Sequence, residues 1–166
     1  MRRYALIYLV VLVAFFVLET TPWAQAFTVG TWTQFLAEVS GGLMQWFDGK
    51  VVVQGSNIRN GQTGYAVSIK AGCNGVEAAM ILAAAILAYP APWGRKLLGM
   101  AVGVMAIQLL NIIRIISLYY LGEWSEKALT IAHLYVWPGL IILDALIIFL
   151  VWMHWLGKPS ARPAVS

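Results

Sequence analysis

Residues 97–121 read LLGMAVGVMAIQLLNIIRIISLYYL, an apolar run with few polar side chains. A helix needs about 20 apolar residues to cross the roughly 30 Å hydrocarbon core of a bilayer. This run is long enough to do so. It predicts a transmembrane helix and places the chain among integral membrane proteins.

Three further apolar runs surround it, at residues 4–18, 73–89 and 134–156. The later runs are joined by short connections, which make consecutive helices antiparallel neighbours. We therefore expect an all-α polytopic membrane protein, a four-span helical bundle that forms a single membrane domain over residues 1–166 with a small extracytoplasmic segment at 19–72. The first run is short for a span, and Ala24-Gln25-Ala26 fits a signal-peptide cleavage site, so a retained span and a cleaved leader both stay open.

The composition of the chain points the same way. Of its 166 residues, 61% are apolar and 11% are charged, whereas soluble domains are about 45–50% apolar and about 25% charged. This excludes a water-soluble globular enzyme, a disordered chain and a nucleic-acid-binding domain, and it makes membrane lipids the expected surroundings. The net charge of +4 comes from basic residues at the ends of the apolar runs, not from a cluster.

The distribution of charge predicts the orientation. With the N-terminus inside, the charged residues of the inner segments are all basic: Arg2, Arg3, Arg95, Lys96, Lys158 and Arg162. The outer segments then carry acidic residues in slight excess. Because basic residues stay on the cytoplasmic side, both termini are expected there, with residues 19–72 on the outer side of the membrane.

The outer segment shows two local patterns. Residues 33–47 place apolar side chains on one face of a surface helix, which Gly41 and Gly42 are expected to interrupt. Two β-rich runs, at 51–53 and 65–69, flank an Asn-Gly turn signal, and together they predict a β-hairpin.

Ionisable side chains within the spans are costly and so are candidates for function. Arg114 shares one helix face with Asn111 and Gln108, which indicates a face turned toward the bundle interior. Its guanidinium is always charged and can donate several hydrogen bonds to an oxyanion or a carboxylate. Asp144 is a candidate buried counter-ion of Arg114, and Glu77 a candidate partner of Arg114 or an orienting group.

Cys73 lies at the outer start of the second span, between glycines. A helix N-terminus favours the thiolate, so Cys73 is either a reactive nucleophile or an inert buried thiol. His133 lies at the outer end of the fourth span and is either a catalyst or an interfacial anchor. Topology brings Cys73, Arg114 and His133 to the same side of the bundle, and a thiol, an imidazole and a guanidinium are the parts of acyl transfer. One Cys and one His are too few for a zinc site, so no metal and no cofactor are expected.

The stretches YAVSIKAGCNG (65–75), NIIRI (111–115) and AH (132–133) resemble the exosortase/archaeosortase family. Asn74 stands where most members carry a serine, and together with the short chain it resembles the small exosortase H subfamily. The resemblance implies a membrane-embedded cysteine transpeptidase or protease that cleaves C-terminal sorting signals through a thioester intermediate. It implies partners that are exported proteins with a short motif (IPTLxxWG-type or PEP-CTERM-like), a transmembrane helix and a basic end.

Carried over by position, the resemblance makes Cys73 the nucleophile, His133 the general base and acid, and Arg114 the group that stabilises the oxyanion. The supporting candidates are Asn111, Glu77, Asp144 and Asn74. Two other functions stay open from the residues alone. One is a non-enzymatic membrane scaffold with a structural Arg114–Asp144 pair. The other is a small transporter, which the apolar inner halves of the spans disfavour.

Overall fold

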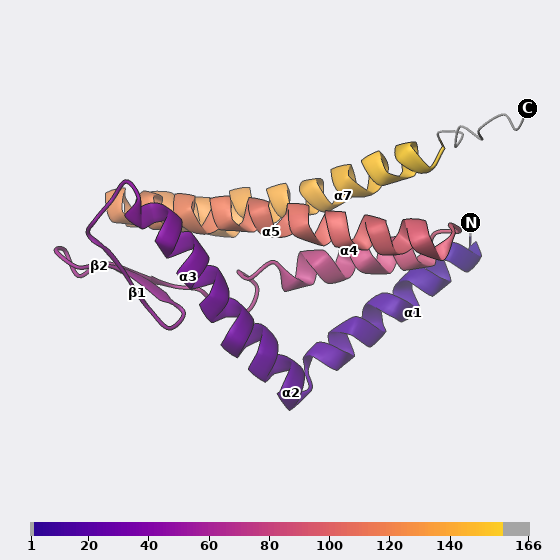
Figure 1. Ribbon diagram of the computed structural model, residues 1–166, viewed down its shortest axis with the longest axis horizontal. Helices are drawn as coiled ribbons and strands as arrows, with labels where there is room; N and C mark the ends of the chain where they lie inside the picture. Colours follow the sequence, from indigo (N-terminus) through magenta and orange to yellow (C-terminus); the bar gives the residue numbers. More distant parts are fainter. Residues whose placement is uncertain (1, 158–166) are drawn as a thin grey trace, which may run out of the picture.

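The apolar helices α4 (Val76–Ala88), α5 (Trp93–Trp124) and α7 (Trp137–Leu156) run side by side along the long axis of the molecule, and α1 (Arg2–Glu19) packs against α4 (Figure 1). The computed structural model describes residues 2–157. Lys158 and Arg162, which we counted among the inner basic residues, lie outside the described part. The predicted helical membrane architecture is confirmed in this coarse form.

The helices differ in how well they suit a membrane. Helix α5 and the segment Glu126–Leu156, made of α6 (Glu126–Ile131), η2 (Ala132–Val136) and α7, are both long and apolar enough to cross. Helix α1 is long and apolar enough to count as a candidate span only when it is taken together with Pro22–Gln45, and the two parts are bent by 76° relative to each other. Helix α4 has 13 residues, which is about 20 Å. The chain is thus a multi-pass membrane protein, and the count of four spans stays a prediction.

Helix α4 starts later than the sequence predicted. Gly75 precedes its first turn with φ +73°, a left-handed conformation that glycine adopts without strain. Cys73 therefore lies in the loop before α4 and not in its first turn. In contrast, α5 extends past the predicted 97–121 in both directions, and its 32 residues span about 48 Å.

Basic side chains join the helices at one end of the bundle. Lys96 Nζ donates to the Leu87 carbonyl near the end of α4 (2.6 Å), and Arg95 donates to the Leu156 carbonyl at the end of α7 (3.1 Å). Cations are favourable at helix C-termini, where the carbonyl groups lack partners within the helix. These two contacts close one end of the bundle.

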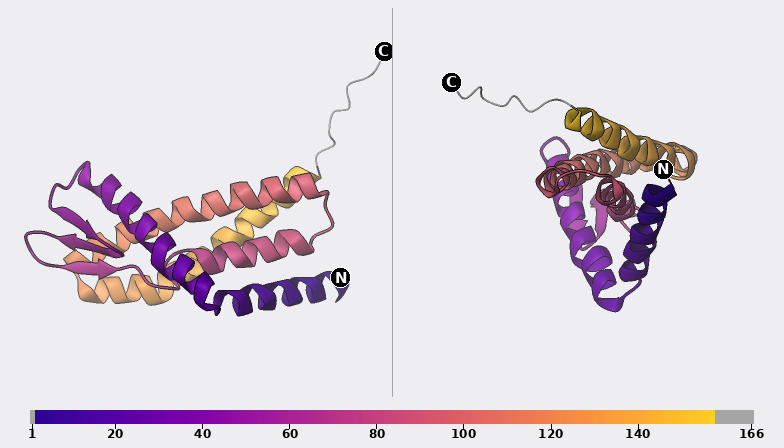
Figure 2. Two further views of the ribbon diagram at one scale, coloured as in Figure 1. Left: turned by 60° about the horizontal axis from the view of Figure 1, so that its bottom comes forward. Right: turned by 90° about the vertical axis from the view of Figure 1, so that its right-hand side faces the viewer.

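Residues 19–72, which the sequence predicts to lie outside the membrane, form a second layer against α5. It contains α2 (Pro22–Gln25), the π-helix η1 (Ala26–Thr31), α3 (Trp32–Gln45) and a small sheet (Figure 2). The predicted interruption at Gly41 and Gly42 is wrong, because α3 continues through both glycines. Gly41 has a packing role instead, since a Cβ there would collide with Val53.

The sheet has the antiparallel order β1 (Val51–Gln54), β2 (Asn57–Asn60) and β3 (Ala66–Ser68). Both predicted strand regions exist, but they do not pair with each other, because β2 forms from the expected turn and lies between them. Gly55, with φ +60°, allows the chain to reverse after β1. The Asn60 side chain accepts hydrogen bonds from the Gln62 and Thr63 amides, which holds the second turn.

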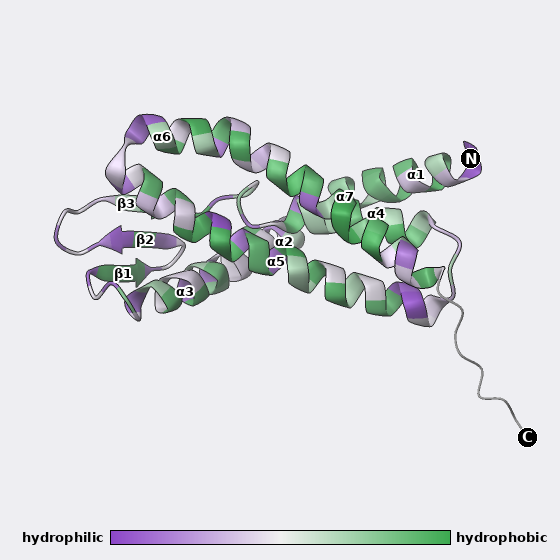
Figure 3. Cartoon of the chain, turned by 90° about the horizontal axis from the view of Figure 1, so that it is seen from above, coloured by the Kyte–Doolittle hydropathy of each residue, from purple (hydrophilic) through white to green (hydrophobic). Residues whose placement is uncertain are grey.

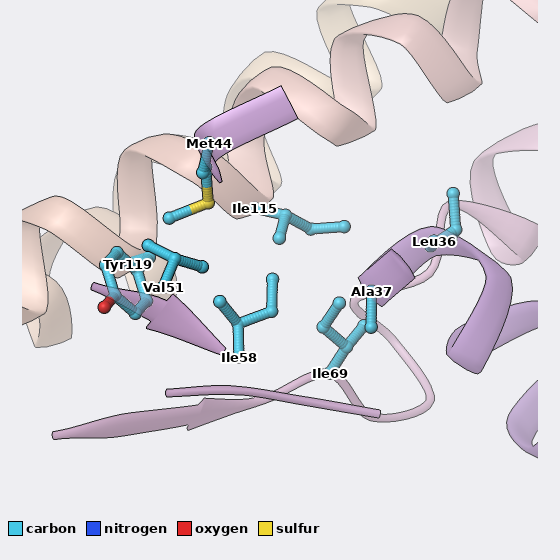
Figure 4. Packing of buried hydrophobic residues seen from close by; sticks show 8 residues of the cluster. All are labelled: Leu36, Ala37, Met44, Val51, Ile58, Ile69, Ile115 and Tyr119. Atoms are coloured by element: carbon cyan, nitrogen blue, oxygen red, sulfur yellow. The ribbon is translucent and has the colours of Figure 1, made fainter. Parts of the chain in front are cut away.

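One face of the sheet is buried against α3 and α5 (Figure 4). Ile58 of β2 is fully buried, and Met44 of α3 and Tyr119 of α5 pack around it. Ile69 extends this core toward the loop that carries Cys73. Burial of a large aliphatic or aromatic side chain contributes about 1.5–3 kcal/mol, so this core fixes the loop on α5.

Candidate active site

Cys73 lies in the short loop between β3 and α4 and is half-buried. Its amide donates to the carbonyl of Lys70 at 3.0 Å, which closes a tight turn. Gly72 (φ +80°) and Gly75 (φ +73°) lie on either side of it in left-handed conformations. The thiol is therefore presented on a bent segment and not on a helix.

Arg114 of α5 holds this loop. Its side chain is only 3% exposed, its Nη1 donates to the Gly72 carbonyl at 3.4 Å, and its Nη2 lies 3.6 Å from the Cys73 sulfur. The Nε atom is buried and has no hydrogen-bond partner within the described residues. The guanidinium thus contacts the nucleophile candidate directly and keeps donor capacity beside it.

Glu77, in the first turn of α4, contacts the same loop from the other side. Its carboxylate accepts a hydrogen bond from the Gly72 amide at 2.8 Å. Within residues 2–157 it forms no ion pair with Arg114, so it acts on the loop backbone. Negative charge at a helix N-terminus is favourable, so the first turn of α4 is a suitable position for the Glu77 carboxylate.

The pKa of the Cys73 thiol is raised above its ordinary value, chiefly by burial. The Arg114 charge and the hydrogen bond from the Lys70 backbone lower it, and Glu77 raises it, but burial dominates. The expected stabilisation of the thiolate by a helix N-terminus is therefore not what the structure shows. Burial therefore favours the neutral thiol over the thiolate at Cys73.

His133 of η2 lies half-buried on the wall of a cavity of about 740 Å³ that Cys73 and Arg114 also line. The structure thus brings the three residues from three different segments to one cavity. His133 makes no hydrogen bond to Cys73 in the described part of the chain. Catalytic contacts of this kind are often long in unliganded enzymes.

Asn74 is fully buried and points away from this chemistry. Its Nδ2 donates to the Thr28 carbonyl (3.0 Å), its Oδ1 accepts from the Val76 amide (3.2 Å), and its own carbonyl accepts from the Trp32 indole (3.3 Å). These bonds tie the Cys73 loop to η1, α3 and α4. Asn74 is an anchor of the loop.

Asn111 and Asp144 lie beneath the loop. Asn111 is 3% exposed, both atoms of its amide lack partners within residues 2–157, and it packs under Gly75. Asp144 lines a small separate cavity with Asn111 and Gly75. No ion pair between Asp144 and Arg114 is formed among the described residues, so the expected counter-ion contact is missing.

Residues 65–70 form the other wall of the cavity, and they were not among the predicted site residues. The Tyr65 hydroxyl is buried without a partner in the described chain, and burial, followed by Glu123 and Glu126, raises its pKa. The signal was the pattern YAVSI at residues 65–69, which ends four residues before Cys73. Among the described residues, no group of His, Cys, Asp or Glu is placed to hold a metal ion.

A comparison with protein families adds one finding. A family model described as transmembrane exosortase matches residues 2–153, which is most of the chain. The match includes the Cys73 loop, Arg114 and His133. Searches of curated proteins and of solved structures find no match.

Proposed function

Because the chain belongs to the transmembrane exosortase family, we propose that it is a cysteine transpeptidase or protease that cleaves C-terminal sorting signals of exported proteins. The observation that carries the proposal is the single cavity lined by Cys73, Arg114 and His133. A nucleophile, a base and a charge stabiliser around one space are what acyl transfer requires. The finer assignment to the small exosortase H subfamily stays a prediction.

The proposed reaction has two halves. His133 takes the proton of the Cys73 thiol, and the thiolate attacks the scissile carbonyl carbon. The tetrahedral intermediate collapses as its C–N bond breaks and His133 returns the proton to the leaving amine, which leaves a thioester on Cys73. An amine or water then attacks the thioester, His133 removes its proton, and the thiol is regenerated.

Arg114 supplies the electrostatic part of this mechanism. Its Nη2 lies next to the sulfur, so an oxyanion that forms on the carbon bonded to sulfur falls within its reach. A fixed donor aimed at developing charge is worth a large factor in rate, because no solvent has to reorganise. The raised pKa of Cys73 makes a general base necessary and gives His133 its role.

The depth of the cavity suits a membrane-anchored substrate. From Trp93 to Arg114, α5 rises about 30 Å, the thickness of the hydrocarbon core. With Trp93 at the inner interface, Arg114 and Cys73 lie at the outer one. There a motif that precedes a transmembrane helix emerges from the lipid. We infer that the protein acts on the outer face of the bacterial inner membrane.

The proposal is tested by co-expression with reporters that carry an IPTLxxWG-type or PEP-CTERM-like tail, followed by a transmembrane helix and a basic end. Wild type is compared with Cys73→Ala, Arg114→Ala and His133→Ala. His154→Ala is the matched control, because His154 is an exposed histidine near the other end of α7. Membrane levels of each variant are measured by immunoblot.

We expect processing by wild type and the His154 variant, and loss of processing in the other three. Processing that persists in Cys73→Ala would contradict the thiol mechanism. A wild-type chain that leaves every reporter uncut would favour the scaffold alternative, whose structural support, an Arg114–Asp144 pair, is not formed in the described residues.

A further inference from the structure

Strand β3 is an edge strand next to the candidate nucleophile. The sheet order β1-β2-β3 leaves one side of β3 without a neighbouring strand. Seen from above, that side faces α6 (Figure 3). The chain continues from Ser68, the last residue of β3, to Cys73 within five residues. Any chain laid along β3 therefore leads to the thiol.

The ladder between β2 and β3 shows which backbone groups are used. The Asn60 amide donates to the Tyr65 carbonyl (2.8 Å), and the Ile69 amide donates to the Ser56 carbonyl (2.9 Å). In an antiparallel pair, every second residue directs its amide and carbonyl toward the partner strand. Tyr65, Val67 and Ile69 therefore direct their backbone groups toward β2. The residues between them direct their amides and carbonyls away from β2.

Those alternate residues are Ala66 and Ser68. Both are exposed, and both line the cavity. Their amide and carbonyl groups have no hydrogen-bond partner among residues 2–157. An unpaired row of backbone donors and acceptors is a template for another strand.

The opposite walls leave room for such a strand. Leu118 of α5, Leu129 of α6 and His133 lie across the cavity from β3. Its volume of about 740 Å³ is in the range of pockets that enclose ligands, and an added strand lies about 4.8 Å from its neighbour.

We propose that the sorting motif of the substrate binds in this cavity as an added β-strand on the free edge of β3, so that main-chain hydrogen bonds carry the scissile peptide to Cys73. This inference rests on the proposed function. Strand addition gives affinity through the backbone, and the side chains of alternate residues give specificity. The side chains of the bound motif that face α5 would contact Ile115 and Leu118, which line the cavity. Apolar side chains are therefore favoured at every second position of the motif.

The direction of the added strand follows from the topology. Tyr65 packs beside Gly122 of α5, whereas the loop at Gly72 contacts Arg114, about 12 Å closer to the membrane along that helix. Strand β3 thus descends toward the lipid. A substrate whose transmembrane helix follows its motif descends in the same sense, so the added strand is parallel to β3.

The first test removes a single backbone donor. Ser68→Pro deletes an amide on the free edge and leaves the β2–β3 ladder intact, because residue 68 directs no donor toward β2. Ser68→Ala deletes only the hydroxyl and is the matched comparison. We expect a reporter that wild type processes to be cut about tenfold more slowly by Ser68→Pro than by Ser68→Ala. Alkylation of Cys73 by a small maleimide shows whether the loop is intact.

The second test changes the substrate and keeps the wild-type chain. Synthetic peptides with the reporter's motif are methylated at one backbone nitrogen at a time and used as competitors of processing in detergent. The proposal predicts weaker competition, by about tenfold, at every second residue. This test decides the question where Ser68→Pro fails to fold.

Equal rates for the two Ser68 variants with an intact Cys73 loop would overturn strand addition. So would a methylation pattern without a two-residue period. Failure of the proposed function is recognised separately, because processing would then either persist in Cys73→Ala or be missing from wild type, whatever the Ser68 variants do.

Discussion

The guanidinium of Arg114 lies 3.6 Å from the sulfur of Cys73 and at the same time donates to the carbonyl of Gly72, the residue before Cys73. One side chain from the middle of α5 thus fixes both the charge environment of the thiol and the path of its loop. The two effects can be separated by experiment, because charge acts on the pKa and loop path acts on stability.

The reactivity of Cys73 should report its electrostatic surroundings. It is the sole cysteine, so alkylation of the chain in detergent measures this thiol alone. Burial raises its pKa above the ordinary 9.0, and we expect the alkylation rate to be slow at neutral pH and to reach its midpoint above that value.

Two substitutions should move this midpoint in opposite directions. Glu77→Gln removes a negative charge that raises the pKa of Cys73, so the midpoint falls, and the new amide oxygen still accepts from Gly72. Arg114→Gln removes the positive charge that lowers the pKa, so the midpoint rises. Shifts of the same sign in both variants would contradict this account.

Gly75→Ala should destabilise the protein and weaken processing. Alanine at φ +73° costs about 1–2 kcal/mol, and its Cβ would lie 3.0 Å from the Gln108 amide nitrogen. Thermal unfolding in detergent measures the loss. Gly49→Ala is the control, because Gly49 has an ordinary φ and a Cβ added there would meet no other atom within 4 Å. A similar loss in both variants would argue against the conformational cause.

Gly122→Ala should disturb the cavity wall through Tyr65. A Cβ at this position would collide with the Tyr65 hydroxyl, and overpacking of this kind costs about 1–3 kcal/mol. Tyr65→Phe alone should be close to neutral, because the hydroxyl has no partner among the described residues. The double variant should recover part of the stability lost in Gly122→Ala, as measured by a double-mutant cycle. Strict additivity would exclude the collision.

Asn74→Ala should destabilise the Cys73 loop by about 1 kcal/mol, because it removes the side-chain acceptor of the Val76 amide. The Thr28 carbonyl loses one donor but keeps the Thr33 hydroxyl. Asn74→Ser keeps an acceptor for the Val76 amide and should cost less. Hydrogen exchange of the Val76 amide distinguishes the two variants. Equal exchange rates would show that the side chain does not hold the start of α4.

The sequence predicted the convergence of Cys73, Arg114 and His133 because topology alone sets which helix ends share a side of the membrane. It did not predict the partners of the acidic residues. Spacing along one helix gives depth, but the rotation and tilt of α7 decide whether Asp144 meets Arg114, and these depend on packing. The same limit applies to Glu77, whose partner is a backbone amide that no pattern marks.

The sheet shows a different limit. The sequence predicts strands at 51–53 and 65–69, and both form. Their pairing depends on Gly55, whose turn reverses the chain earlier than the Asn-Gly signal predicts. Because of that early turn, β2 lies between the two runs, and β3 pairs with β2 and not with β1.

The length of α5 has a mechanical consequence. One unbroken helix joins Trp93, at its start, to Arg114 beside the thiol, and under the proposed function it acts as a ruler that sets the height of the cut. A substrate anchor of about 20 residues matches this ruler. Under the proposed function, a shorter anchor would place its cleavage site below the thiol and a longer one would place it above, so we expect processing to depend on the length of the anchor as well as on the motif.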